Sequence, residues 1–265
     1  MRKLLLLLFS AFTVISCAEI DTNDYEGDPE PYKPKELRLK SISLKWNEDI
    51  TINTQYTEFY YDQNGLLSTI EHSQVLETVE ERSIKNFYYT GLLLDSIIDQ
   101  RTVLFTSGPN EGEEDKYQSE DYFFHNKDGL ITDEENWAND YKMAHTKFFY
   151  EGDKLIKSII YWTPHPPNKP HTTESNITYN SKGNVVSAGD NRYTYDNMNA
   201  IMKNVYAPSL HKLRCLSKNN VLKYYYNTSG GFQENVYTYN KDSYPETKKV
   251  YDGGKLITTE TFTYY

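Results

Sequence analysis

Acidic residues are the most numerous candidates for chemistry in this 265-residue chain, and two clusters of them stand out. The members, in chain order, are Glu111, Glu113, Glu114, Asp115, Asp133, Glu134 and Glu135. Paired carboxylates act as general acid and base in glycoside hydrolysis, and clustered ones bind calcium. Runs of acids are also the ordinary composition of solvated loops, so their spacing alone assigns no catalytic role.

Histidines and sequence motifs add no stronger catalytic signal. His165 and His171 bracket a proline-rich segment, but a metal site needs further ligands that the spacing does not supply. The chain has no G-x-S-x-G, H-E-x-x-H, P-loop or G-x-G-x-x-G pattern. We therefore expect no enzyme, no metal site and no cofactor. A glycan-active enzyme with carboxylates contributed by separate strands stays open as an alternative, because such pairs are invisible to spacing.

Aromatic residues suggest a binding role instead. The chain contains 25 Tyr, 11 Phe and 3 Trp, and rings with one polar edge suit sugar faces and protein surfaces. Most of them stand in a repeated pattern, where cross-strand ring pairs stabilise a sheet. Trp137 and Trp162 lie outside that pattern, and Trp162 leads into the proline-rich segment with His165. We predict these three residues as contacts for a glycan or envelope-protein ligand.

The net charge bears on the class of partner that the protein could bind. The formal net charge is −10, which argues against a nucleic-acid partner. The two cysteines are Cys17 and Cys215.

The first residues have the composition of a targeting segment. Arg2 and Lys3 precede an apolar stretch that is too short to span a bilayer, so residues 1–16 are predicted to be a signal peptide. Val14-Ile15-Ser16-Cys17 resembles a bacterial lipobox, which implies lipidation of Cys17 and anchoring to the outer membrane. Both the cell-surface and the periplasmic orientation stay open. Residues 17–36 are rich in acids and proline and are predicted to be a flexible linker.

These residues must be positioned by a repeated element: two or three aromatics, usually an Asn or Asp, then a Gly and aliphatic residues. The copies begin at Phe59, Phe87, Tyr122, Phe148, Ile177, Tyr193, Tyr224, Tyr237 and Val250. Aromatic and β-branched residues favour strands, and the Asn or Asp with the Gly favours a tight turn, so each copy predicts a β-hairpin. In the C-terminal half the copies are unevenly spaced, and some of them mark successive strands.

The expected fold is all-β. We predict about 14 to 17 antiparallel strands joined as a meander over one domain, residues 37–265. So many strands must form a coiled single sheet or a closed or half-open barrel-like structure. Exposed loops are expected at Ser107–Lys116 and Thr163–Thr172, and the only short helix within Tyr206–Asn220.

The repeated units resemble YD or RHS-type repeats. With the lipobox, the layout is similar to a family of uncharacterised Bacteroidetes lipoproteins with a porin-like fold, over about residues 38 to 265. That resemblance implies the fold and no known activity. Two departures are the missing Asp in the copies at Phe87 and Phe148, and the missing Gly after Asn240, which leaves the strand register there open.

An outer-membrane β-barrel is a further alternative, and strand alternation tests it. Glu80 and Arg82 fall on one face of their strand, whereas Glu81 and Lys85 fall on the other. A basic residue facing lipid at the bilayer midplane costs roughly 2 to 4 kcal/mol. The mean hydropathy of −0.74 agrees with a wall that meets water. The sequence therefore favours a lipid-anchored binding or scaffolding module.

Overall fold

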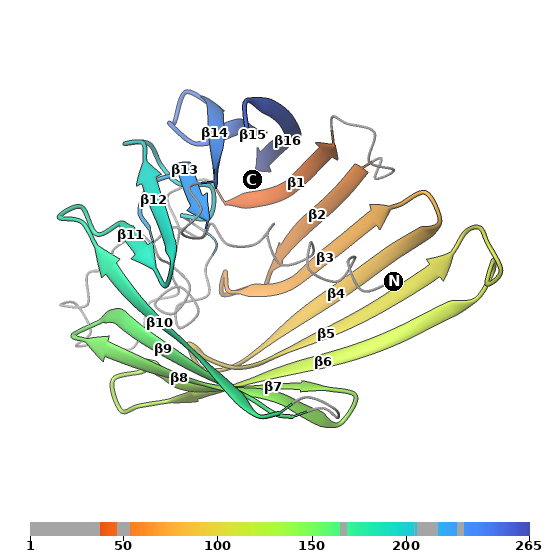
Figure 1. Ribbon diagram of the computed structural model, residues 1–265, viewed down its shortest axis with the longest axis horizontal. Helices are drawn as coiled ribbons and strands as arrows, with labels where there is room; N and C mark the ends of the chain where they lie inside the picture. Colours follow the sequence, from red (N-terminus) through yellow and green to blue (C-terminus); the bar gives the residue numbers. More distant parts are fainter. Residues whose placement is uncertain (1–37, 47–53, 165–168, 204, 206–216, 227–230) are drawn as a thin grey trace.

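The computed structural model describes all residues except 1–37, 47–53, 165–168, 204, 206–216 and 227–230 (Figure 1). The described residues form sixteen strands. Their bounds are β1 (Leu39–Trp46), β2 (Thr54–Tyr61), β3 (Leu67–Val75), β4 (Val79–Thr90), β5 (Leu93–Phe105), β6 (Glu114–His125), β7 (Ile131–Ala138), β8 (Tyr141–Glu151), β9 (Lys154–Trp162), β10 (His171–Tyr179), β11 (Val185–Ala188), β12 (Asn191–Tyr195), β13 (Val221–Tyr226), β14 (Gly231–Tyr239), β15 (Pro245–Asp252) and β16 (Lys255–Tyr264).

Each strand pairs antiparallel with its neighbours in the chain, and β1 pairs with β16, so the sheet closes into a barrel. The predicted all-β meander of 14 to 17 strands is confirmed, and of the predicted shapes the closed barrel is the one formed. The described part of the chain contains no helix long and apolar enough to cross a membrane. Residues 206–216 of the segment expected to hold a helix lie outside the described residues, and residues 217–220 are not helical.

The two ends of the barrel differ in their connections. We call the end with the short β2–β3, β6–β7, β10–β11 and β14–β15 turns the turn end, and the opposite end the loop end. The β5–β6 connection at the loop end is shorter than predicted, because Glu114–Lys116 already pairs with β5. Similarly, β10 begins at His171, within the predicted second loop.

The repeated Asn or Asp forms each of these four turns by accepting three backbone hydrogen bonds. In the first turn the Asp62 carbonyl accepts from the Gly65 amide at 3.0 Å, and Asp62 Oδ1 accepts from the amides of Asn64 and Leu66 at 2.8 Å each. Asn126, Asn180 and Asn240 do the same in the other three. Gly65 has a φ of 83°, a left-handed conformation that glycine adopts without steric cost.

The turn at Asn240 keeps this geometry although it lacks the glycine. Ser243 takes the glycine position with a φ of 65°, and its amide donates to the Asn240 carbonyl at 3.0 Å. The register that the sequence left open is therefore the ordinary one, with Thr238 opposite Thr247 and a bulge before Pro245.

Tyrosines at the end of β2, β4, β8, β10 and β16 fasten those strands to their predecessors. The hydroxyl of Tyr61 donates to the Leu39 carbonyl at 3.0 Å, and that of Tyr179 donates to the Leu155 carbonyl at 2.8 Å. The other bonds of this kind are Tyr89 to Leu67, Tyr150 to Ile131 and Tyr264 to Pro245. Burial raises the pKa of Tyr61, Tyr150 and Tyr264, so these phenols stay protonated and keep donating.

The hydrophobic core lies inside the barrel at the turn end. Its members include Phe59 and Leu67 of the first repeat and Ile177 and Val185 from the other side of the barrel. The connection between β12 and β13 adds two further members, Ile201 and Val205. All of these side chains are less than one tenth exposed. Because side chains lining an open lumen would stay accessible, the turn end of the barrel is filled.

Candidate functional site

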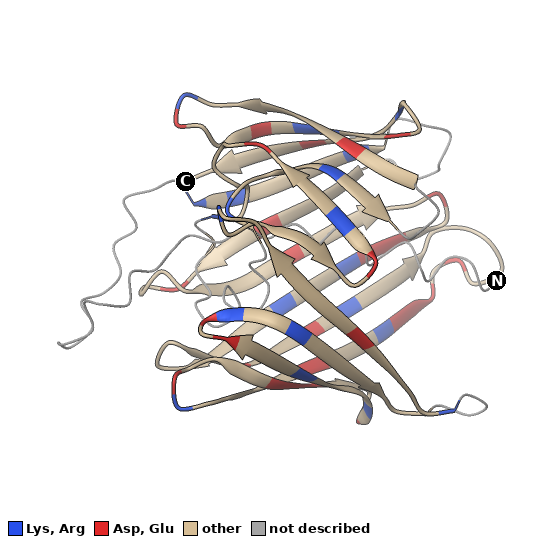
Figure 2. Ribbon diagram, turned by 60° about the vertical axis from the view of Figure 1, so that its left-hand side comes forward, with Lys and Arg blue, Asp and Glu red and all other residues tan. Residues whose placement is uncertain are grey.

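Strand alternation divides the barrel wall into two faces. We call inner face the side chains that share the alternation of the core residues, such as Phe59 of β2 and Phe87 of β4, and outer face the others. Glu81 and Lys85 belong to the inner face, and Glu80 and Arg82 to the outer face, as the sequence predicted. Each face therefore carries charged residues, and Figure 2 shows both signs of charge along the strands.

A chain of polar side chains crosses the inner face from β2 to β5. Gln55 donates to Gln74 at 2.7 Å, and Gln74 donates to Glu81 at 2.7 Å. Arg101 completes the chain through an ion pair with Glu81 at 3.1 Å. Gln74 and Glu81 are 3% and 6% exposed, so the carboxylate is compensated in a buried position by both an amide and a guanidinium.

A second network lies beside the first, nearer the turn end. Asp99 accepts from Ser83 at 2.5 Å and pairs with Lys85 at 3.1 Å. On the neighbouring strands, Thr57 Oγ1 lies 2.9 Å from His72 Nδ1. Burial lowers the pKa of His72, which favours the neutral ring. The charged groups near it form two ion pairs, Lys85 with Asp99 and Arg101 with Glu81.

The acidic clusters highlighted in the sequence do not converge. Glu111 and Glu113 lie on the exposed β5–β6 connection, whereas Asp133 and Glu135 of β7 face outward and Glu134 faces inward. This separation follows directly from the two-residue period of a strand. Among the described residues, no group of three or more His, Cys, Asp and Glu side chains is placed to hold a metal ion.

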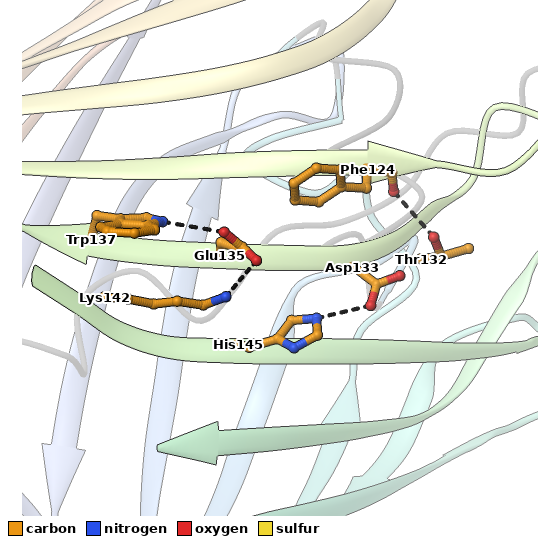
Figure 3. Close-up of polar contacts among 7 residues, drawn as sticks. All are labelled: Phe124, Thr132, Asp133, Glu135, Trp137, Lys142 and His145. Carbon is orange, nitrogen blue, oxygen red and sulfur yellow. Dashed lines mark hydrogen bonds and ion pairs between the residues drawn. The ribbon is translucent and has the colours of Figure 1, made fainter. Parts of the chain in front are cut away.

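Asp133 and Glu135 instead each contact a basic side chain on the outer face (Figure 3). His145 Nε2 lies 2.9 Å from Asp133 Oδ1, and Lys142 Nζ contacts Glu135. The pKa of the Glu135 carboxyl is lowered, chiefly by the hydrogen bond from Lys142. Each carboxylate thus has a basic partner on the adjacent strand β8, and neither is placed opposite another acid.

The predicted contact residues are distributed over both faces. Trp137 lies on the outer face, where its Nε1 donates to Glu135 at 3.4 Å (Figure 3). Trp162 lies on the inner face at the loop end, stacked on His171 at 5.8 Å, and its Nε1 donates to Thr173 at 3.2 Å. The wall therefore separates the two tryptophans. His165 lies outside the described residues, as do Cys17, the signal peptide 1–16 and the linker 17–36.

Tyrosines of β12 and β13 form an inner-face group that the sequence did not single out. Tyr193 and Tyr224 are stacked at 5.4 Å with 18° between their planes, and Tyr226 follows Tyr224 at 5.9 Å. Tyr226 donates to both carboxylate oxygens of Asp252 at 3.2 Å. The available signal was the two-residue spacing of the tyrosines, which places Tyr224 and Tyr226 on one face.

Comparisons with known proteins concern the fold alone. No protein-family model and no curated protein matches the sequence. The chain is similar to the crystal structure of a porin-like protein from Bacteroides uniformis, with 11% identity, a TM-score of 0.39, and coverage of 86% of this chain and 98% of that one. It is also similar to a porin-like protein from Bacteroides vulgatus, with 14% identity, a TM-score of 0.31, and coverage of 87% and 99%. The similarity to YD or RHS-type repeats stays a prediction.

Proposed function

We propose that this protein is an outer-membrane-associated β-barrel that binds a polar ligand on its inner face near the loop end. One observation carries the proposal. Inward-facing side chains change along the strands from a filled apolar core at the turn end to polar and aromatic groups toward the loop end, and on β12 and β13 these groups are half-buried. Ligand sites of this kind combine aromatic walls with a few fixed polar groups, and the mouths of β-barrels are one of their usual places.

Charged residues on the outer face support a barrel whose outer face is in contact with water. Glu58 of β2 lies directly opposite Glu71 of β3, and Arg82 of β4 also faces outward. Two facing carboxylates repel each other. The Tyr56 and Tyr60 hydroxyls donate to Glu58, and contact with water would weaken the repulsion further. We propose that lipidation of Cys17 attaches the protein to the membrane.

Three of the described acids of the inner face are held in ion pairs. Glu81, Asp99 and Glu260 are paired with Arg101, Lys85 and Lys248, respectively. We assign these three carboxylates a structural role, and the proposed activity is binding.

An outer-membrane barrel that spans the bilayer with its strands is the second candidate. Its supporting observation is the closure of an even number of antiparallel strands around inward-facing charged residues, an arrangement found in bacterial outer-membrane barrels. In that case the outer-face charges would sit where the wall leaves the hydrocarbon region.

Fractionation distinguishes the two candidates. Cells producing the full chain or its Cys17→Ala variant are lysed, and the membranes are washed with alkaline carbonate. We expect the full chain in the membrane fraction and the variant in the soluble fraction. A variant that remains in carbonate-washed membranes contradicts the lipid-anchored barrel and supports the spanning barrel. A soluble full chain contradicts the assignment of the anchor to Cys17.

A further inference from the structure

Tyr226 is held in a defined orientation on the inner face at the loop end. It pairs with Gly231 across β13 and β14, and its hydroxyl reaches Asp252 on β15, two strands away. A Cβ atom added to Gly231 would lie 2.6 Å from the Tyr226 Cε2 atom. The ring therefore lies across the glycine backbone, and the absence of a side chain at Gly231 is what permits this position.

The Tyr226 ring lies against Gly231 on the inner face of the wall. Polar side chains of the neighbouring strands share this face. Gln233 pairs with Tyr224 on one side and with Asp252 on the other, so phenol, amide and carboxylate form a row across three strands. The Tyr224 hydroxyl donates to Asn191 Oδ1 at 3.3 Å, which adds a second amide at the same level.

This combination matches the chemistry of a sugar ring. The C–H face of a pyranose packs on an aromatic ring, while its hydroxyls donate to carboxylate and amide oxygens and accept from amide N–H groups. A ring that is already held by Gly231 and Asp252 loses little side-chain entropy on binding. On the basis of the proposed function, we propose that Tyr226 forms a saccharide-binding subsite together with Gln233 and Asp252. The subsite would bind a neutral hexopyranose unit.

The roles of the neighbouring residues follow from their positions. Tyr226 contacts the sugar, and Asp252 both orients the Tyr226 hydroxyl and accepts from the sugar. Gly231 is a positioning residue, because it acts only through the ring that lies over it. Replacing Gly231 by alanine therefore displaces the platform without removing it.

The test is calorimetric titration of the purified protein with cellohexaose, maltohexaose, xylohexaose and chitohexaose. We expect at least one of these probes to bind. Tyr226→Ala should weaken that binding at least 10-fold, Gly231→Ala by a similar factor, and Tyr226→Phe by about 2- to 5-fold because it keeps the ring. Tyr88→Ala, on the outer face, should leave it unchanged. Thermal unfolding of each variant shows that the barrel is intact.

Two outcomes overturn the subsite. One is that none of the four probes binds; the other is that Tyr226→Ala and Gly231→Ala bind as the unsubstituted protein does. If a probe that still binds these variants is lost in Trp162→Ala, the inner face binds sugar elsewhere and the proposed function survives. If binding is lost only in Tyr88→Ala, the ligand lies on the outer face and both assignments fail.

Discussion

At the third aromatic position of the repeat, the structure uses tyrosine for its hydroxyl and not only for its ring. Tyr61, Tyr150 and Tyr179 each donate to a carbonyl at the start of the preceding strand. Phenylalanine would fill the same space but remove this donor from the carbonyl of a buried residue. His125 takes this position in β6, and its Nε2 is buried without a hydrogen-bond partner. In this repeat the sequence departs from the pattern at the position where the bond is made elsewhere.

Replacing Tyr179 by phenylalanine should lower the free energy of unfolding by about 1 kcal/mol, the usual net value of such a hydrogen bond. Chemical denaturation at constant pH measures it. Tyr88→Phe is the matched control, because Tyr88 is 48% exposed on the outer face and should show no change. An equal loss in both variants would contradict a specific role for the hydroxyl bond.

His72 makes stability depend on pH in a defined direction. Burial lowers its pKa in the folded state, against the opposing attraction of Glu81. The unfolded chain therefore binds a proton more readily, so stability is fully present above a pH of about 6.5 and decreases as the pH falls toward the lowered folded pKa. Lys85, Arg101 and Asp99 also act on the ring.

His72→Gln should flatten the pH dependence of the melting temperature between about pH 7 and pH 5. Part of the dependence should persist, because burial also lowers the pKa of His125. Calorimetric scans across this range provide the measurement. If the variant lost stability over the same range as steeply as the unsubstituted protein, His72 would not be the responsible group.

At the scale of elements, the hairpin turns explain why so much of this fold was readable from the sequence. The Asn or Asp and the Gly of each turn act on neighbours within four residues, so the strand boundaries follow from local chemistry alone. The turn at Asn240 was the exception. Its backbone conformation comes from Ser243, a residue that the pattern does not mark, because serine adopts a positive φ only at a cost.

Ser243→Gly should stabilise the barrel by about 1 kcal/mol, because it removes the steric cost of a left-handed conformation. The reciprocal change, Gly183→Ser at a φ of 81°, should destabilise it by a similar amount. Urea denaturation of the two variants measures both changes. Two shifts of the same sign would contradict this explanation of the turn.

The candidate site was predicted less well than the fold. Trp137 and Trp162 were chosen for lying outside the repeat, and the two residues proved to lie on opposite faces of the wall. Tyr226 was hidden because it stands within the repeat pattern. Its role depends on Gly231 and Asp252, which come from two further strands, and no local rule joins residues so far apart in the chain.

At the scale of the whole molecule, closure distinguishes this chain from an open sheet of repeats. The β1–β16 pairing runs from Leu39 opposite Tyr264 to Trp46 opposite Thr258, so neither end of the meander is left as an edge. An unpaired edge strand offers its amides and carbonyls to other chains and promotes aggregation. The last strand is therefore as important for solubility as for stability.

A chain ending at Gly254, without β16, should lose cooperative unfolding and form large aggregates, because β1 and β15 would become edges. Size-exclusion chromatography with light scattering checks this. Thr261→Ala is the control, since its side chain lies on the outer face of β16 and the backbone pairing is kept. A monomeric, cooperatively folding truncated chain would show that closure is dispensable.

The junction of the chain ends fixes a direction for the molecule. Arg38 directly precedes β1 at the filled base, where its carbonyl accepts from the Tyr265 amide at 2.9 Å. A linker on the N-terminal side of Arg38 therefore joins the barrel at the turn end. If the protein is held by a lipid anchor, the loop end that carries Tyr226 would point away from the bilayer and be accessible to ligands in solution.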